Sequence, residues 1–89
     1  MLESVKKALR ISGAIFDTEI QELIDAALAD LKLSGISCQN VQDPLIRRAV
    51  TIYCKANFGL DNKDSEKYQK SYDMLKNHLS LAGDYNGVI

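Results

Sequence analysis

The stretch DPLIRRAVTIYCKANFG, residues 43–59, decides how this chain folds. An aspartate followed by a proline is typical of a helix start, because the carboxylate caps free N–H groups and proline suits the first helical turn. The glycine at position 59 favours a helix end. Between these signals the polar residues occupy one narrow sector, made of Arg47, Arg48, Thr51 and Lys55. We therefore expect a helix that is apolar around most of its circumference, with Ile46, Ala49, Val50 and Tyr53 in the core.

A helix of this kind needs other helices to cover it, and three further segments have helical periodicity while none reads convincingly as a strand. They are expected at about residues 2–9, from Asp17 or Thr18 to about residue 33, and from Asp64 or Ser65 to Leu81. Either Asp17 or Thr18 would be a suitable N-cap for the second of the four helices. Their apolar positions are Leu2, Val5 and Leu9; Ile20, Leu23, Ile24, Ala27, Leu28 and Leu31; and Tyr68, Tyr72, Leu75 and Leu79. The sequence predicts an all-α fold, a small bundle of about four helices with a central third helix and a short extended C-terminal tail. We divide it into a helical domain, residues 1–82, and a tail, residues 83–89.

Composition limits the class of protein. The chain has 89 residues, enough for one domain, with 46% hydrophobic and 26% charged residues of both signs, which argues against disorder. Its net charge of −1 argues against a generic nucleic-acid binder, which usually carries a basic excess. The first residues include Glu3 and do not resemble a secretory signal, and no apolar run is long enough to span a membrane, so we expect synthesis and use in a cytoplasm.

Residues suited to catalysis or metal binding do not form a recognisable motif. The single histidine, His78, is expected on the polar side of the last helix, without a carboxylate or cysteine one turn away. Cys38 and Cys54 lie in different segments, so reduced thiols are expected. Glu22 and Asp25 are one turn apart but lack a third ligand. We expect no enzymatic activity, no cofactor and no metal.

Charge is segregated along the chain. Residues 17–30 contain five acids and no base, whereas residues 47–76 contain seven bases and four acids, a net +3. For most single residues this pattern favours solvated faces of one molecule, and for the two segments as a whole it would also suit a head-to-tail contact between subunits. The tail residues Tyr85, Val88 and Ile89 are apolar enough to lie on a neighbouring subunit. The candidate interface residues are Glu22, Asp25, Arg47, Arg48, Lys55 and Tyr85.

Three segments in order, VKKALRIS, FDTEIQELIDAALADLKLSGI and DPLIRRAVTIYCKANFG, resemble the small head-tail connector proteins of tailed phages and prophages, which are often labelled DNA-packaging proteins. The resemblance covers residues 2–59 and rests on packing signals. These are a short helix ending in Leu9-Arg10-Ile11, a long helix with an aspartate followed by Ile20, Leu23-Ile24 and Ala26-Ala27, and a third helix entered through Pro44.

The resemblance implies a structural protein that catalyses no reaction. Its subunits would form a ring, commonly dodecameric, beneath the portal protein at the capsid vertex. That ring would extend the channel through which DNA passes without sequence-specific binding, and would offer a docking surface to the tail or to a stopper protein. The implied location is the head-tail junction of the virion, after assembly in the bacterial host cytoplasm and without any membrane partner.

The alternative is a small helical DNA-binding regulator whose third helix, led by Arg47 and Arg48, enters a major groove. A recognition helix needs an exposed polar face near its N-terminus. The same turns here carry Leu45, Ile46, Ala49 and Val50. Because these apolar residues crowd the reading face, the pattern favours the connector interpretation over the regulator.

Overall fold

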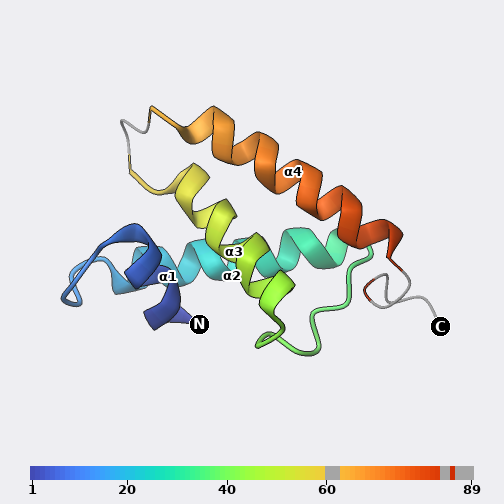
Figure 1. The fold of residues 1–89 in the computed structure, drawn as a ribbon. Helices are drawn as coiled ribbons and strands as arrows, with labels where there is room; N and C mark the ends of the chain where they lie inside the picture. The colour runs from blue at the N-terminus through green and yellow to red at the C-terminus, as the bar shows by residue number, and fades with distance from the viewer. Residues whose placement is uncertain (60–62, 83–84, 86–89) are drawn as a thin grey trace.

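The computed structural model describes residues 1–59, 63–82 and 85, and within them the secondary structure is entirely helical (Figure 1). The helices are α1 (Leu2–Leu9), α2 (Asp17–Leu33), α3 (Pro44–Asn57) and α4 (Ser65–Leu81). This confirms the expected four-helix, all-α fold. The extended tail that we expect at residues 83–89 lies, apart from Tyr85, outside the described residues.

Helix α3 is the central element, as its sequence predicts. It packs against α1, α2 and α4, and Figure 1 shows it crossing α2 with α4 on its other side. Its buried residues come from several sides of the helix: Ile46, Ala49, Val50, Ile52, Cys54 and Ala56. Tyr53, which the sequence places in the core, is only half-buried at the edge of the core, where its ring packs edge-on against the buried ring of Tyr72 with centroids 5.2 Å apart.

The N-terminus of α3 is capped as expected. Asp43 Oδ1 accepts hydrogen bonds from the backbone N–H groups of Leu45, at 2.9 Å, and Ile46, at 3.4 Å, and Pro44 occupies the first helical position. These bonds satisfy donors that have no partner inside the helix. The helix ends at Asn57, and Gly59 takes a φ of 88°, a left-handed conformation that glycine adopts without a side-chain clash.

The start of α2 differs from the expectation that Asp17 or Thr18 would cap it. Phe16 occupies the N-cap position and Asp17 is the first helical residue. The Asp17 carboxylate lies 2.7 Å from the ammonium group of Lys6, whose side chain is only 9% exposed. The carboxylate of Asp17 therefore pairs with the buried Lys6 of α1 and does not cap α2.

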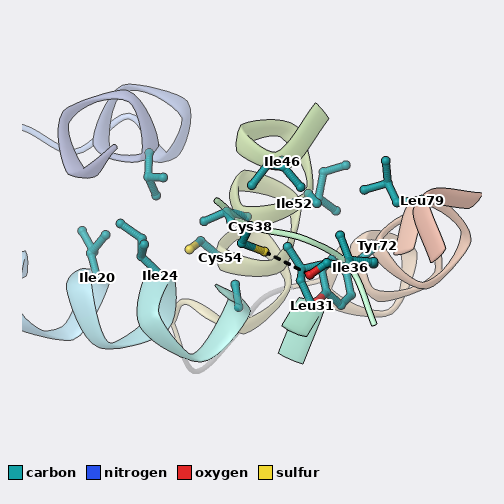
Figure 2. Close-up of a cluster of buried hydrophobic side chains, with 14 residues drawn as sticks. Ile20, Ile24, Leu31, Ile36, Cys38, Ile46, Ile52, Cys54, Tyr72 and Leu79 are labelled. Carbon is teal, nitrogen blue, oxygen red and sulfur yellow. Dashed lines mark hydrogen bonds between the residues drawn. The ribbon is translucent and has the colours of Figure 1, made fainter. Parts of the chain in front are cut away.

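The core is one cluster built from all four helices and the α2–α3 loop (Figure 2). Helix α2 contributes Ile20, Ile24, Ala27 and Leu31, α4 contributes Tyr72 and Leu79, and the loop contributes Ile36 and Cys38. Leu23, Leu28, Tyr68 and Leu75 are partly buried at its edge. The helical periods read from the sequence thus identify the inner faces of α2 and α4 correctly.

Candidate assembly interface

The histidine, the two cysteines and the acids are the side chains best suited to chemistry. Within residues 1–59, 63–82 and 85, no three His, Cys, Asp or Glu side chains are placed to hold a metal ion. His78 is exposed, and Cys38 and Cys54 are buried free thiols. Burial raises the pKa of Cys54 to about 12 and also raises the pKa of Cys38. Both thiols therefore resist ionisation and act as core residues.

None of the described helices has the length and apolar character needed to cross a membrane.

Two of the five acids on α2 are engaged within the chain. Asp17 pairs with Lys6, as described above. Asp30 Oδ2 accepts a hydrogen bond of 2.5 Å from the hydroxyl of Tyr72 and lies 3.1 Å from Lys76 Nζ. The bond from Tyr72, and secondarily the contact with Lys76, lowers the pKa of the Asp30 carboxyl. Part of the charge segregation in the sequence thus stabilises the subunit itself.

The remaining acids of α2, Glu19, Glu22 and Asp25, are exposed. Asp25 accepts a 3.0 Å hydrogen bond from the side chain of Gln21 one turn earlier. No salt bridge is formed by these three carboxylates within the described part of the chain. They give this side of α2 three negative charges that face solvent.

The predicted basic residues of α3 are exposed to different degrees. Arg48 is exposed, whereas Arg47 and Lys55 are half-buried. Arg47 Nε is buried without a hydrogen-bond partner among the described residues. Lys55 Nζ lies 5.5 Å from the centre of the Tyr68 ring, a cation–π contact with α4. Arg48 is therefore the base on α3 with the most surface free for another molecule.

Tyr85 packs on its own chain. Its hydroxyl donates to the Asp43 carboxylate, 2.9 Å from Oδ2, and its carbonyl accepts a 2.6 Å bond from the backbone N–H of Ser37. The residue is half-buried beside a hollow lined by Ser37, Gln39, Asn40, Asp43, Ile46 and Tyr85. Contact of Tyr85 with a neighbouring subunit stays a prediction. Only the exposed part of its side chain could make such a contact.

Exposed apolar side chains are a further feature of the surface, and the sequence analysis did not single them out. The most exposed are Ile15 (86%), Leu33 (88%), Met74 (74%) and Leu81 (78%). Leu33 lies at the end of α2, and Met74 and Leu81 lie seven residues apart on α4. A seven-residue spacing is close to two helical turns, so Met74 and Leu81 share one side of α4. This signal was available in the sequence as apolar residues outside the core stripe.

The two sides of the bundle can be defined by their exposed residues. The outer face of α2 consists of Glu19, Glu22, Ala26, Ala29 and Leu33. The outer face of α4 consists of Lys67, Lys70, Met74, Asn77 and Leu81. Each set follows helical spacing and lies opposite the residues that its helix buries. Because α3 packs against the buried side of both helices, the two outer faces point away from it.

Residues 1–86 match the model of a family described as phage connector protein. No curated protein and no solved structure matches the chain.

Proposed function

We propose that this chain, which belongs to the phage connector protein family, forms a ring below the portal protein of a phage head. The ring extends the DNA channel and provides a surface on which the tail or a stopper protein docks. The observation that carries the proposal is the family match over residues 1–86, nearly the whole chain. A bundle without an assembled metal site in its described part, and with charged and apolar residues on two outer faces, supports a structural role.

Ring formation requires two different surfaces on each subunit that fit one another. On the acidic side we propose Glu22 and Asp25 of α2, which are both exposed. On the basic side we propose Arg48, together with the accessible parts of Arg47 and Lys55. Tyr85 belongs to the same proposal through the exposed part of its side chain, and we keep the division into a helical domain, residues 1–82, and a tail, residues 83–89. The proposed ring is dodecameric in the virion.

The other partners follow from the position of such a ring at the head-tail junction. Portal protein lies on one side, tail or stopper protein on the other, and DNA passes through the centre without sequence-specific contacts. A net charge of −1 suits a conduit, because a strongly basic wall would hold the DNA through its phosphates. Assembly takes place in the cytoplasm of the bacterial host.

The DNA-binding regulator has less support. Helix α3 is surrounded by the other three helices, and Ile46, Ala49 and Val50 in its first turns are buried. Arg48 and Leu45 remain at its accessible edge. A helix enclosed in this way presents too narrow a surface to enter a major groove.

Electron microscopy tests the proposal. The purified protein is imaged alone at high concentration and after mixing with the portal protein of the phage that encodes it. Annular particles, or an added ring of density on the portal, are expected. A chain that stays monomeric with and without portal, and that binds duplex DNA with an affinity falling steeply with salt, would instead identify the regulator.

A further inference from the structure

Helices α2 and α4 are matched in length and pattern. Each has 17 residues, and each places its core side chains at the fourth, eighth, eleventh and fifteenth positions. These are Ile20, Ile24, Ala27 and Leu31 on α2, and Tyr68, Tyr72, Leu75 and Leu79 on α4. Both helices therefore pack on α3 with the same stripe, and they turn the same positions outward.

The two outer faces are complementary at corresponding positions. At the third and sixth positions α2 has Glu19 and Glu22 where α4 has Lys67 and Lys70. At the tenth position Ala26 on α2 corresponds to Met74 on α4, and at the seventeenth Leu33 corresponds to Leu81. Acid thus corresponds to base, a small residue to a large one, and leucine to leucine.

The exposure of these side chains leaves the outer faces available. The four charged residues are exposed and form no salt bridge within the described residues, while Leu33, Met74 and Leu81 are 88%, 74% and 78% exposed. Single exposed apolar residues are common on protein surfaces. Here, however, the exposed apolar residues of α2 and α4 occupy corresponding positions, and so do the opposite charges. This correspondence between the two helices points to a contact.

We propose that the outer face of α2 in one copy of this chain packs in parallel on the outer face of α4 in the next copy. Glu19 and Glu22 then meet Lys67 and Lys70, the side chain of Met74 fits over Ala26 and Ala29, and Leu33 meets Leu81. The inference rests on the proposed ring, and it places the basic partner of Glu22 on α4 in place of the α3 residues proposed above, because the outer face of α4 points away from α3. An antiparallel arrangement is disfavoured, because it would set the glutamates against Leu81 and the lysines against Leu33.

The fold is compatible with this arrangement in a closed assembly. Figure 1 shows α2 and α4 running in the same general direction, with α3 crossing between them. A rotation about an axis near that direction brings α4 of one copy beside α2 of the next with their chain directions matched. The contact is heterologous, so each subunit uses one outer face on each side and repetition forms a ring.

Cysteine pairing tests the register. One variant carries Ala26→Cys and a second, distinguishable by mass, carries Met74→Cys; they are mixed at millimolar concentration in a glutathione redox buffer. The native cysteines are buried, so the introduced thiols react first. The matched control pairs Thr18→Cys with Glu66→Cys, which are exposed and occupy corresponding positions of α2 and α4, about 100° around each helix from Glu19 and Lys67. We expect the 26–74 heterodisulfide to exceed both homodisulfides and the control heterodisulfide.

Charge reversal gives an independent reading of the same contact. Glu19→Lys with Glu22→Lys in the Ala26→Cys chain should lower the heterodisulfide yield about tenfold, and Lys67→Glu with Lys70→Glu in the partner should restore it. Equal yields for the 26–74 pair and the control pair, or homodisulfides in excess, would overturn the inference. If the wild type forms rings but the 26–74 heterodisulfide is not preferred, the α2–α4 contact is wrong while the ring proposal stands. A 26–74 preference without closed rings would support the contact and count against the ring.

Discussion

The hydroxyl of Tyr72 on α4 donates a 2.5 Å hydrogen bond to the carboxylate of Asp30 on α2. Lys76 Nζ lies 3.1 Å from the same carboxylate oxygen and 5.2 Å from the centre of the Tyr72 ring. The tyrosine itself is 1% exposed. This cluster joins α2 and α4, the two helices that flank α3. It therefore fixes the position of α4 relative to α2.

Replacing Tyr72 with Phe should lower the free energy of unfolding by about 1.5–3 kcal/mol, because the ring still packs but one hydrogen bond to a charged acceptor is lost. Urea titration followed by circular dichroism measures the change. In the same assay Asp73→Asn serves as control, since Asp73 is exposed and accepts a hydrogen bond from Gln69 on its own helix. A Tyr72→Phe variant as stable as the control would contradict a stabilising role for the bond.

The pH dependence of stability should also report on Asp30. Its folded pKa is lowered by the Tyr72 hydrogen bond and by Lys76, so the ionised carboxylate favours the folded state. This contribution is complete above the unfolded pKa, near 3.8, and is lost as the pH falls through the folded value. Between neutral pH and pH 3 we expect the free energy of unfolding to fall less in Asp30→Asn than in the wild type. Parallel pH profiles for both proteins would refute this linkage.

Much of the fold follows from local patterns in the sequence. The Asp43-Pro44 start of α3 and the stripes of α2 and α4 depend on neighbouring residues, and the structure agrees with them. The contacts between distant residues do not follow in that way. Asp30 with Tyr72 and Tyr85 with Asp43 each join positions 42 residues apart, and no periodicity specifies such partners.

The interface was harder to predict for the same reason. The net charge of a segment does not tell which acids are engaged inside the subunit, and two of the five on α2 are. The correspondence of α2 with α4 becomes meaningful only once both helices are seen to pack on α3. What the sequence contains is the pattern of each helix, whereas the relation between the two outer faces is a property of the packed bundle.

Replacing Val50 with Asp should abolish folding. Val50 is 0% exposed at the centre of α3, and burying an unpaired charge there costs several kcal/mol, on the order of a small domain's total stability. Circular dichroism and thermal unfolding measure the outcome. Leu45→Asp is the control on the same helix, because Leu45 is 41% exposed and should tolerate the charge. A cooperative unfolding transition in Val50→Asp would refute its place in the core.

The buried cysteines should be nearly inert in the folded protein. With its pKa raised to about 12, Cys54 carries only about one thiolate in ten thousand thiols at pH 8. Ellman's reagent should therefore label neither native thiol until urea unfolds the chain, and then label both. The Ala26→Cys variant, labelled in parallel, is the positive control, because its exposed thiol should react at once. Fast labelling of the wild type before unfolding would contradict the burial of Cys38 and Cys54.

Removing the tail by truncation after Ala82 should leave the helices formed and weaken assembly. The truncation also removes the hydrogen bond between Tyr85 and Asp43, so Tyr85→Phe in the full chain is the control for that bond alone. Far-ultraviolet circular dichroism checks helicity, and sedimentation at several concentrations, with and without portal protein, checks assembly. Assembly of the truncated chain to the same extent as the full chain would count against a tail contact with a neighbour.

The proposed contact between acidic and basic surfaces makes assembly sensitive to charge reversal. Arg48→Glu with Lys55→Glu should reduce ring formation about three- to tenfold, because exposed ion pairs contribute roughly 0.2–1 kcal/mol each and the reversed charges repel. Arg48 is used in place of Arg47, whose Nε is buried and whose replacement would disturb the fold. Negative-stain electron microscopy and sedimentation count the assembled fraction.

Rescue and a charge-matched control distinguish a specific contact from an effect of net charge. Adding Glu22→Lys and Asp25→Lys to the same chain should partly restore assembly, because each subunit again offers one surface of each sign. Lys7→Glu with Arg10→Glu changes net charge by the same amount at exposed positions of α1 and of the turn that follows it, and should leave assembly intact. Rising salt should weaken wild-type assembly, because it screens exposed charges. If the α1 control lowers assembly as much as the α3 reversal, overall repulsion explains the loss and the proposed pairing is wrong.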